Sequence, residues 1–291
     1  MNREVWVPKD LTEFWPFWRR RPEALLYAGG TDLLVKLRAG AVDPPALICL
    51  ERLAELQRVE DRGEQIFLGA GLTHARLLAE PLVLRELPVL TRALRVLGAP
   101  PIRHMATIGG NIVTASPAGD LLPPLYVLDA EVELRREDRC RRLKVKDFIL
   151  GPGRTALGEA EMLSGIWIRK GDSGAIHHFE KVGQRKALAI AVVSLAAVLR
   201  VSAAGVVAEA RLAWGSVGPT IITAPEVEEA LRGQPLSSEL LQSLTPLVRS
   251  AVRPIGDLRA TAEYRRMAAG NLLLRLNQYH QGCRSPAGDP E

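Results

Sequence analysis

The segment Leu25-Leu26-Tyr27-Ala28-Gly29-Gly30-Thr31-Asp32-Leu33-Leu34 decides the fold of the first half of the chain. Its apolar run predicts a strand that ends at the two glycines, after which the pattern becomes helical through about Arg38. Glycine has no Cβ, so the backbone can adopt a positive φ angle and an incoming group can approach it closely. Thr31 or Asp32 can cap the helix, and the exposed N–H groups suit a phosphate. One such segment also fits an ordinary strand-to-helix turn.

A second segment, Thr107-Ile108-Gly109-Gly110-Asn111-Ile112, repeats this arrangement later in the chain. Two such loops can grip one diphosphate. The residues that follow, Thr114-Ala115-Ser116-Pro117-Ala118-Gly119-Asp120, add hydroxyls and one carboxylate in a loop too rich in proline and glycine for a core strand. Because a carboxylate beside a phosphate site usually holds sugar hydroxyls, the two segments together predict a nucleotide site.

At these residues the sequence resembles the flavin-binding medium subunit of the molybdenum hydroxylases, which include xanthine dehydrogenase and aerobic carbon monoxide dehydrogenase. Ala28 to Leu33 looks like the family's first flavin loop, and Thr107 to Ile112 with the Ser116 to Asp120 segment looks like the second. Asp257 to Arg266 is similar to the segment that opens the family's last helix. The resemblance extends from about residue 5 to about residue 282.

This resemblance implies non-covalently bound FAD. Leu97 and Leu163 match aliphatic positions beside the flavin ring, and Lys181 matches a lysine near its pyrimidine. From the residues alone, Leu97 also fits a core leucine and Lys181 a solvent-facing lysine. The resemblance implies no catalytic residue and no metal ligand on this chain, and the FAD-binding residues that it implies are Tyr27, Ala28, Gly29, Gly30, Thr31, Asp32, Leu33, Leu97, Thr107, Ile108, Gly109, Gly110, Asn111, Thr114, Ser116, Asp120, Leu163 and Lys181.

The expected elements and the resemblance together predict an α+β protein. Residues 1–172 are expected to form a two-part FAD-binding domain, a small β-α-β unit plus a mixed β subdomain. A C-terminal antiparallel sheet with a helical layer is expected over 173–282, followed by a disordered tail over 283–291. We place the domain boundary in the polar, glycine-rich segment Lys170-Gly171-Asp172-Ser173-Gly174.

Individual elements follow from periodicity and from turn residues. Apolar spacing predicts a helix over Leu87–Leu97, and Thr12 is expected to cap a short aromatic helix through Arg19. A strand is expected over Tyr126–Leu134. Ala187–Val201 and Val206–Trp214 predict two long strands of a hairpin.

Composition excludes several other classes of protein. A chain of 291 residues exceeds the usual single domain, and 38 Lys+Arg against 33 Asp+Glu give a net charge of +5, too weak to imply nucleic acid. The three cysteines, Cys49, Cys140 and Cys283, are too far apart to predict a zinc or iron–sulfur site. Gly69-Ala70-Gly71 lacks the third glycine of the dinucleotide fingerprint, and His74 is left outside the expected site.

The sequence predicts a cytoplasmic protein with no membrane span. Its first six residues lack the apolar core of a signal peptide. The longest apolar run, Ala187 to Leu199, is shorter than the ~20 residues that cross a bilayer.

The resemblance implies an electron-transfer subunit of a heterotrimer. FAD would receive electrons from a [2Fe-2S] small subunit and pass them to NAD, oxygen or a quinone, while a large subunit with molybdopterin hydroxylates the substrate. Two alternatives are a nucleotide-binding module without redox activity and a free-standing FAD oxidase. The apolar and cationic residues expected at the flavin ring favour the flavoprotein subunit. The expected docking surfaces for the partner subunits are the Leu97 to His104 loop and the aromatic N-terminal segment.

Overall fold

The computed structural model describes residues 3–171, 174–185 and 188–279, which form two compact units. Each unit is built from three separate stretches of chain. Unit 1 contains the chain up to Leu87, Leu97–Ser116 and Asp129–Lys170, and unit 2 contains Pro88–Val96, Pro117–Leu128 and the chain from Gly171 onward. The chain therefore passes between the units five times, at 87/88, 96/97, 116/117, 128/129 and 170/171. The domain boundary expected near residue 172 stays a prediction, and the predicted tail lies outside the described residues.

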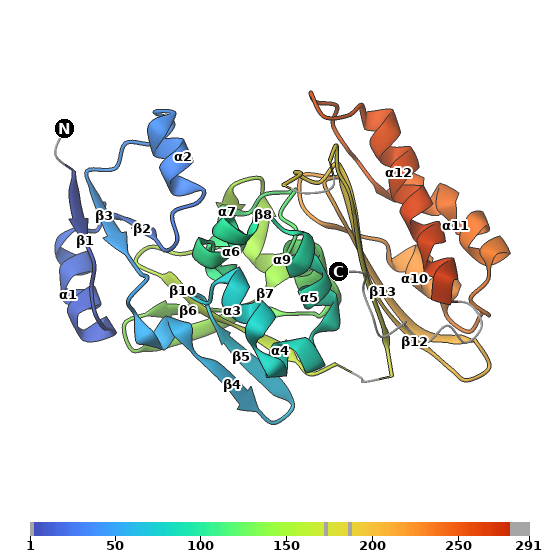
Figure 1. Ribbon diagram of the computed structural model, residues 1–291, viewed down its shortest axis with the longest axis horizontal. Helices are drawn as coiled ribbons and strands as arrows, with labels where there is room; N and C mark the ends of the chain where they lie inside the picture. The colour runs from blue at the N-terminus through green and yellow to red at the C-terminus, as the bar shows by residue number, and fades with distance from the viewer. Residues whose placement is uncertain (1–2, 172–173, 186–187, 280–291) are drawn as a thin grey trace. The chain divides into compact units, whose positions relative to one another are not determined.

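Unit 1 begins with the small β-α-β unit that the sequence predicts (Figure 1). Its three strands are parallel in the order β1-β3-β2, and its elements are β1 (Glu4–Trp6), α1 (Leu11–Arg20), β2 (Leu25–Tyr27), α2 (Leu33–Arg38) and β3 (Ala46–Cys49). The cap of α1 is Asp10 and not Thr12, because the Asp10 carboxylate accepts from the Glu13 backbone N–H. Phe14 and Trp15 are buried against Ile48, so the aromatic stripe forms core.

The second part of unit 1 is a five-stranded antiparallel sheet. Its order is β4-β5-β10-β6-β7, made by β4 (Val59–Arg62), β5 (Gln65–Gly69), β10 (Met162–Arg169), β6 (Glu131–Arg136) and β7 (Arg139–Lys144). Alternate residues such as Ile66, Leu68 and Ile166 are fully buried on one face. The smaller elements are η1 (Ala54–Gln57), α3 (His74–Ala79), α4 (Pro81–Glu86), α6 (Pro100–Met105), α7 (Ile108–Thr114), α9 (Val145–Phe148), β8 (Ile149–Gly151) and β9 (Arg154–Thr155).

Unit 2 is an antiparallel sheet with helices on both faces. The strand order is β11-β12-β13-β14, made by β11 (Ile176–Val182), β12 (Val193–Val201), β13 (Val207–Gly215) and β14 (Ile222–Thr223). One face carries α10 (Pro225–Leu231), α11 (Ser238–Ala251), α12 (Ala262–Leu274) and η2 (Arg275–Tyr279), and the other carries α5 (Pro88–Val96) and α8 (Leu122–Val127) (Figure 1). Tyr126 therefore lies in a helix and not in the predicted strand, and β12 begins at Val193, later than predicted.

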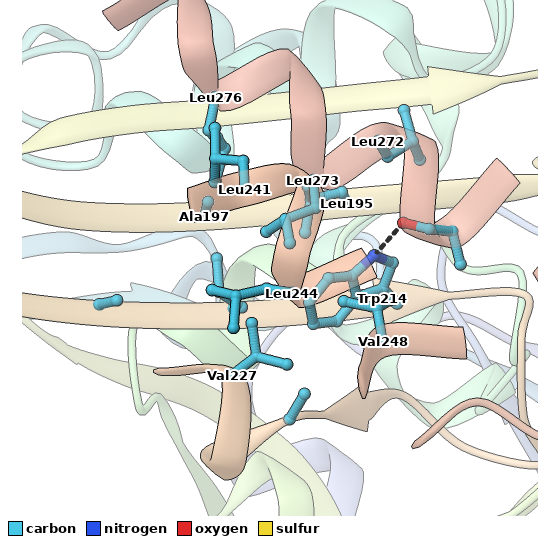
Figure 2. Close-up of a cluster of buried hydrophobic side chains, with 14 of the residues drawn as sticks. Leu195, Ala197, Trp214, Val227, Leu241, Leu244, Val248, Leu272, Leu273 and Leu276 are labelled. Atoms are coloured by element: carbon cyan, nitrogen blue, oxygen red, sulfur yellow. Dashed lines mark hydrogen bonds between the residues drawn. The ribbon is translucent and has the colours of Figure 1, made fainter. Parts of the chain in front are cut away.

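Trp214 lies at the centre of the unit 2 core (Figure 2). Its side chain is fully buried, and its indole N–H donates to the Ala269 carbonyl at 3.1 Å. The opposite face of the same strands carries the small residues Ala213 and Gly215. A Cβ on Gly215 would lie 3.1 Å from Pro123 Cγ of α8, so small residues allow that helix to approach the sheet closely.

The described helices include none that is both long and apolar enough to cross a membrane.

Candidate functional site

The first glycine pair turns the chain from β2 into α2. Gly30 has a φ of +68°, a left-handed conformation that favours glycine, and its carbonyl accepts the first helical hydrogen bond from Leu34 at 2.9 Å. A Cβ on Gly29 would lie 1.7 Å from the Met105 carbonyl oxygen, whereas one on Gly30 would meet only the flexible end of Leu34, at 3.1 Å. Gly29 is thus required for packing, whereas Gly30 is half-buried and is favoured there by its positive φ.

The second glycine pair lies in the first turn of α7 and not in the predicted loop. Thr107 caps this helix, because its hydroxyl oxygen accepts from the Gly110 N–H at 3.1 Å. Gly109 is buried and donates to the Ala70 carbonyl at 2.9 Å, and a Cβ there would lie 2.6 Å from the same oxygen. Gly110 is exposed, with only the Thr107 hydroxyl near its missing Cβ. As in the first pair, the first glycine packs against a backbone carbonyl, and the second is the more exposed of the two.

The two glycine pairs lie together within unit 1. Gly29 rests on Met105, two residues before Thr107. The Thr114 hydroxyl donates to Asp32 Oδ2 at 3.3 Å, and the same oxygen forms an ion pair with Lys36 at 2.7 Å. The Asp32 side chain makes no capping bond to the first turn of α2. Two segments far apart in sequence are therefore joined by backbone packing and by a side-chain hydrogen bond.

The two apolar side chains expected at the flavin ring, Leu97 and Leu163, are both buried in unit 1. Leu97 is 8% exposed and Leu163, on β10, is 6% exposed. The Arg103 guanidinium donates to the Leu97 carbonyl at 3.0 Å and so holds the segment that leads into α6. Burial and the neighbouring Cys49 raise the pKa of Tyr27 to about 12, so the phenol stays neutral.

A buried polar group beside the second glycine pair, the side-chain oxygen of Asn111, lacks a hydrogen-bond partner within the described residues. The imidazole of His74 is also buried nearby, next to the Thr107 backbone. Burial lowers the pKa of His74 to about 4, so its ring is neutral at pH 7. The His74 backbone N–H donates to the Ala106 carbonyl at 3.0 Å, which ties α3 to the segment before Thr107.

Asp120 and Lys181 form a buried ion pair within unit 2. Lys181 Nζ lies 2.7 Å from Asp120 Oδ2, and it also donates to the Val96 carbonyl at 2.8 Å and the Ala189 carbonyl at 3.2 Å. The other oxygen, Asp120 Oδ1, is buried without a partner among the described residues. Burial raises the pKa of Asp120, although the Lys181 ammonium opposes this shift.

Comparison with known proteins identifies the family. Residues 1–168 match the FAD binding domain in molybdopterin dehydrogenase, and residues 178–279 match the CO dehydrogenase flavoprotein C-terminal domain. The chain belongs to this FAD-binding family of the molybdopterin dehydrogenases. The family and the FAD cofactor predicted from the sequence are thereby confirmed.

Relatives of this FAD-binding family cover nearly the whole chain. The nicotinate dehydrogenase FAD-subunit of Eubacterium barkeri is 30% identical and covers 96% of this chain and 98% of its own length. A putative xanthine dehydrogenase FAD-binding subunit of Escherichia coli is 31% identical over 84% of each chain. A solved carbon monoxide dehydrogenase chain from Hydrogenophaga pseudoflava superimposes with a TM-score of 0.89 at 28% identity, covering 94% of this chain and 96% of that one.

The residues present fit FAD. Gly30 is half-buried and Gly110 is exposed, so both leave the backbone accessible to a diphosphate. Backbone N–H groups are the kind of donor that phosphate oxygens accept. The unpartnered side-chain oxygen of Asn111 is an acceptor suited to ribose or ribityl hydroxyls. The cluster in unit 1 brings together Gly29, Gly30, Asp32, Gly110 and Thr114; the individual contacts with FAD stay predictions.

His74 is the residue that sequence reasoning left out of the site. A single histidine in the first turn of a helix carries no special pattern. The pairing of Thr73 with Thr107 and the hydrogen bond from the His74 N–H to the Ala106 carbonyl place it beside the second glycine pair. That pairing is long-range, and periodicity cannot reveal it.

Proposed function

We propose that this chain is the electron-transfer subunit of a molybdenum hydroxylase-type dehydrogenase. FAD would receive electrons from a [2Fe-2S] small subunit and deliver them to an external acceptor, while the substrate reacts at the molybdenum cofactor of a large subunit. Relatives include the carbon monoxide dehydrogenase medium chain of Hydrogenophaga pseudoflava, 29% identical over 90% of this chain. The observation that carries the proposal is the meeting of two glycine pairs in unit 1, in which Gly30 is half-buried and Gly110 is exposed.

The chain's own residues bind and orient the cofactor. The backbone at Gly30 and Gly110 would hold the diphosphate, and Asn111 and Asp120 would accept from hydroxyls. The matched motifs suggest further contacts with FAD, which we also propose, at Tyr27, Ala28, Thr31, Leu33, Thr107, Ile108 and Ser116. Leu97 and Leu163 would pack against the ring. Bound FAD supplies the ability to exchange electrons both singly and in pairs, which links a one-electron cluster to a two-electron acceptor.

Purification of the chain alone tests this function. We expect about one FAD per chain, yellow protein and weak binding of FMN, because the site grips a diphosphate. A folded, colourless chain that binds ADP but no flavin would instead support the nucleotide-binding module. Oxidation of a purine, an aldehyde or carbon monoxide by the isolated chain would support the free-standing oxidase.

The complete assembly tests the electron-transfer role. Reconstitution with a [2Fe-2S] chain and a molybdenum chain should restore electron flow from substrate to FAD, observed as bleaching of the flavin absorbance. Steady-state turnover with NAD, oxygen or a quinone then identifies the acceptor. Flavin bleaching that needs no iron–sulfur chain would contradict the proposed route. A cytoplasmic location, expected from the N-terminal sequence, stays a prediction.

A further inference from the structure

The loop that leads into α12 presents two large apolar side chains to solvent. Ile255 is 78% exposed, and Leu258 is completely exposed. Single exposed apolar residues are ordinary on a protein surface. These two, however, lie three residues apart in one loop, and the first turns of α12 add the exposed side chains of Tyr264 and Met267. Their burial against a partner would be favourable roughly in proportion to the apolar area removed from water.

Hydrogen bonds within unit 2 hold this loop in one conformation. The Asp257 carboxylate accepts from the backbone N–H groups of Arg259 and Ala260 at 2.8 and 3.2 Å, and the Asp257 N–H donates to the Ala260 carbonyl at 3.0 Å. Buried Arg265 donates to the same carboxylate at 2.7 Å. The leucine inside this turn is therefore held in place before any partner binds, and a preorganised side chain loses little conformational freedom on binding.

The charges around these apolar residues are mainly positive. The exposed charged residues of 253–266 are three arginines and two carboxylates, Arg253, Arg259, Arg266, Asp257 and Glu263. Buried Arg265 forms an ion pair with Asp257 at 2.7 Å and offsets that carboxylate. Two copies of this surface facing each other across a twofold axis would bring like charges together, which disfavours a homodimer through it. A partner with an apolar pocket and carboxylates around the pocket complements both features.

We propose that this part of unit 2 docks the molybdenum-cofactor chain, with Leu258 inserted into an apolar pocket that carboxylates surround. We call it the Leu258 surface, and it consists of Ile255, Leu258, Tyr264 and Met267 with Arg253, Arg259 and Arg266. The inference rests on the proposed function, because the partner is taken from the assembly proposed there. The iron–sulfur chain is expected at the Leu97 to His104 segment of unit 1, which leaves the large chain for unit 2. An apolar anchor inside a charged rim is typical of stable interfaces.

Calorimetric titration tests the proposal. The FAD-loaded full-length protein and its Leu258→Asp variant are titrated separately with the purified molybdenum chain and with the purified [2Fe-2S] chain. Leu258→Asp should raise the dissociation constant for the molybdenum chain at least about tenfold, because a carboxylate would replace the apolar anchor and face the carboxylates around the pocket. The affinity for the iron–sulfur chain and the FAD content should stay unchanged. Because the Leu258 side chain is completely exposed, the variant should unfold at the same temperature as the unmodified protein.

Further variants separate apolar packing from charge. Leu258→Met keeps an apolar side chain of similar volume and should bind the molybdenum chain within about threefold of the unmodified protein. Arg266→Glu should weaken binding at low salt and have a smaller effect at high salt, because charges at the rim act over a distance that salt shortens. The matched controls are Leu150→Asp, at an exposed leucine on β8, and Arg20→Glu, at an exposed arginine on α1, and both should bind normally.

Three outcomes would overturn the proposal. Unchanged affinity of Leu258→Asp for the molybdenum chain would remove the Leu258 surface from that interface. Weaker binding of the iron–sulfur chain alone would assign the surface to that chain. An unmodified protein that is a dimer in solution, and a Leu258→Asp variant that is a monomer, would assign it to a second copy. A failure of the proposed function differs from all three, because the unmodified protein itself would then bind no FAD or neither partner chain.

Discussion

At the scale of single residues, the two glycines of each pair have different roles. Gly29 and Gly109 each lie against a backbone carbonyl of a neighbouring segment, whereas the Cβ positions of Gly30 and Gly110 meet only side-chain atoms, at 3.1 Å or more. The first glycine of each pair therefore lets two segments approach, and the second is the one proposed to lie at the diphosphate. The sequence shows two identical pairs and cannot show this difference, because it depends on contacts with Met105 and Ala70.

Substitutions in the second glycine pair, Gly109 and Gly110, distinguish an effect on FAD binding from an effect on folding. Gly110→Val should give folded, colourless protein, because the side chain would occupy the space proposed for the diphosphate. Gly109→Ala should destabilise the fold, since its Cβ would lie 2.6 Å from the Ala70 carbonyl. Absorbance at visible wavelengths and thermal unfolding distinguish the two effects. Full flavin content in Gly110→Val would show that the diphosphate lies elsewhere. Gly30→Val is a less clean test, because Gly30 also has a positive φ.

Two buried histidines predict destabilisation by acid. Burial lowers the pKa of His74 and of His178 to about 4, from about 6.5 in an unfolded chain. The unfolded state therefore binds protons first, so the free energy of unfolding is highest above pH 6.5 and falls as the pH decreases toward 4. Each histidine can contribute up to about 3 kcal/mol over this window. Urea unfolding at pH 7 and pH 5 measures the loss.

Variants assign this pH dependence to particular histidines. His74→Gln should reduce the slope of stability against pH, and the exposed His104 gives the control His104→Gln, which should not. An unchanged slope in His74→Gln would mean that His74 is protonated normally in the folded protein.

At the scale of elements, the start of α12 explains a motif that the family resemblance only recognised. Thr261 caps the helix by accepting from the Tyr264 N–H at 3.1 Å. Asp257 accepts from the Arg259 N–H at 2.8 Å and from buried Arg265 at 2.7 Å, and Arg265 also donates to the Val192 and Ser216 carbonyls. These hydrogen bonds hold the pKa of Asp257 well below its usual range. The motif thus fastens α12 to the sheet.

Loss of Arg265 should weaken unit 2 without direct loss of a flavin contact. Arg265→Met removes the donor to two buried carbonyls and one of the donors to Asp257. We therefore expect the free energy of unfolding to fall by about 3 kcal/mol. Thr261→Ala removes only the cap and should cost about 1 kcal/mol. Chemical denaturation measures both. Small and equal losses of stability in Arg265→Met and Thr261→Ala would mean that water replaces the Arg265 guanidinium.

The short helix α6 is the docking surface that we predict beside the glycine pairs. The sequence predicts docking at the Leu97 to His104 loop, and most of that segment is α6, which exposes Ile102 by 39% and Met105 by 52%. The Met105 backbone supports Gly29, and a cluster that delivers electrons must come close to the flavin. The aromatic N-terminal segment, the other predicted surface, contributes Phe14 and Trp15 to the core.

Charged substitutions on α6 test this docking. Ile102→Asp with Met105→Asp should weaken binding of the [2Fe-2S] chain at least about tenfold, because apolar interface anchors carry much of the affinity. FAD content should stay unchanged. Leu150→Asp, at a residue 54% exposed on β8, is the matched control. Calorimetric titration with the iron–sulfur chain gives the affinities, and equal binding by all three proteins would exclude α6 from the interface.

Proline and glycine show where sequence reasoning succeeded and where it could not. Periodicity predicted α5 and the long strands, while the FAD contacts inferred from the two glycine pairs stay predictions. Each of the pairs Pro100-Pro101 and Pro123-Pro124 opens a helix that the sequence analysis did not predict, because proline suits the first helical turn. Gly109 and Gly110 begin a helix because Thr107 caps it. The local sequence preference of proline and glycine allows either a turn or the start of a helix, and tertiary packing selects between the two.

At the scale of the whole molecule, the two units share the chain in alternation. Unit 2 obtains α5 and α8 from early segments; these helices contact its sheet and carry the buried residues Val89, Leu90, Leu122 and Leu125. A fragment of residues 1–170 would therefore contain two apolar helices without their sheet. We expect this fragment to bind a hydrophobic dye and to aggregate, whereas residues 3–279 together stay folded. Cooperative unfolding of the isolated fragment near the temperature of the intact protein would contradict this expectation.

This alternation also fixes an order of events on the ribosome. When residue 170 has been synthesised, every segment of unit 1 exists, but α5 and α8 must wait for strands that are still to be translated. Unit 2 can close only after α12 has emerged, close to the end of synthesis. Asp120 is translated well before Lys181, so their ion pair forms late. A nascent chain that stalls before β11 therefore cannot yet hold Asp120 in place, and full flavin affinity should be acquired only near release of the finished polypeptide.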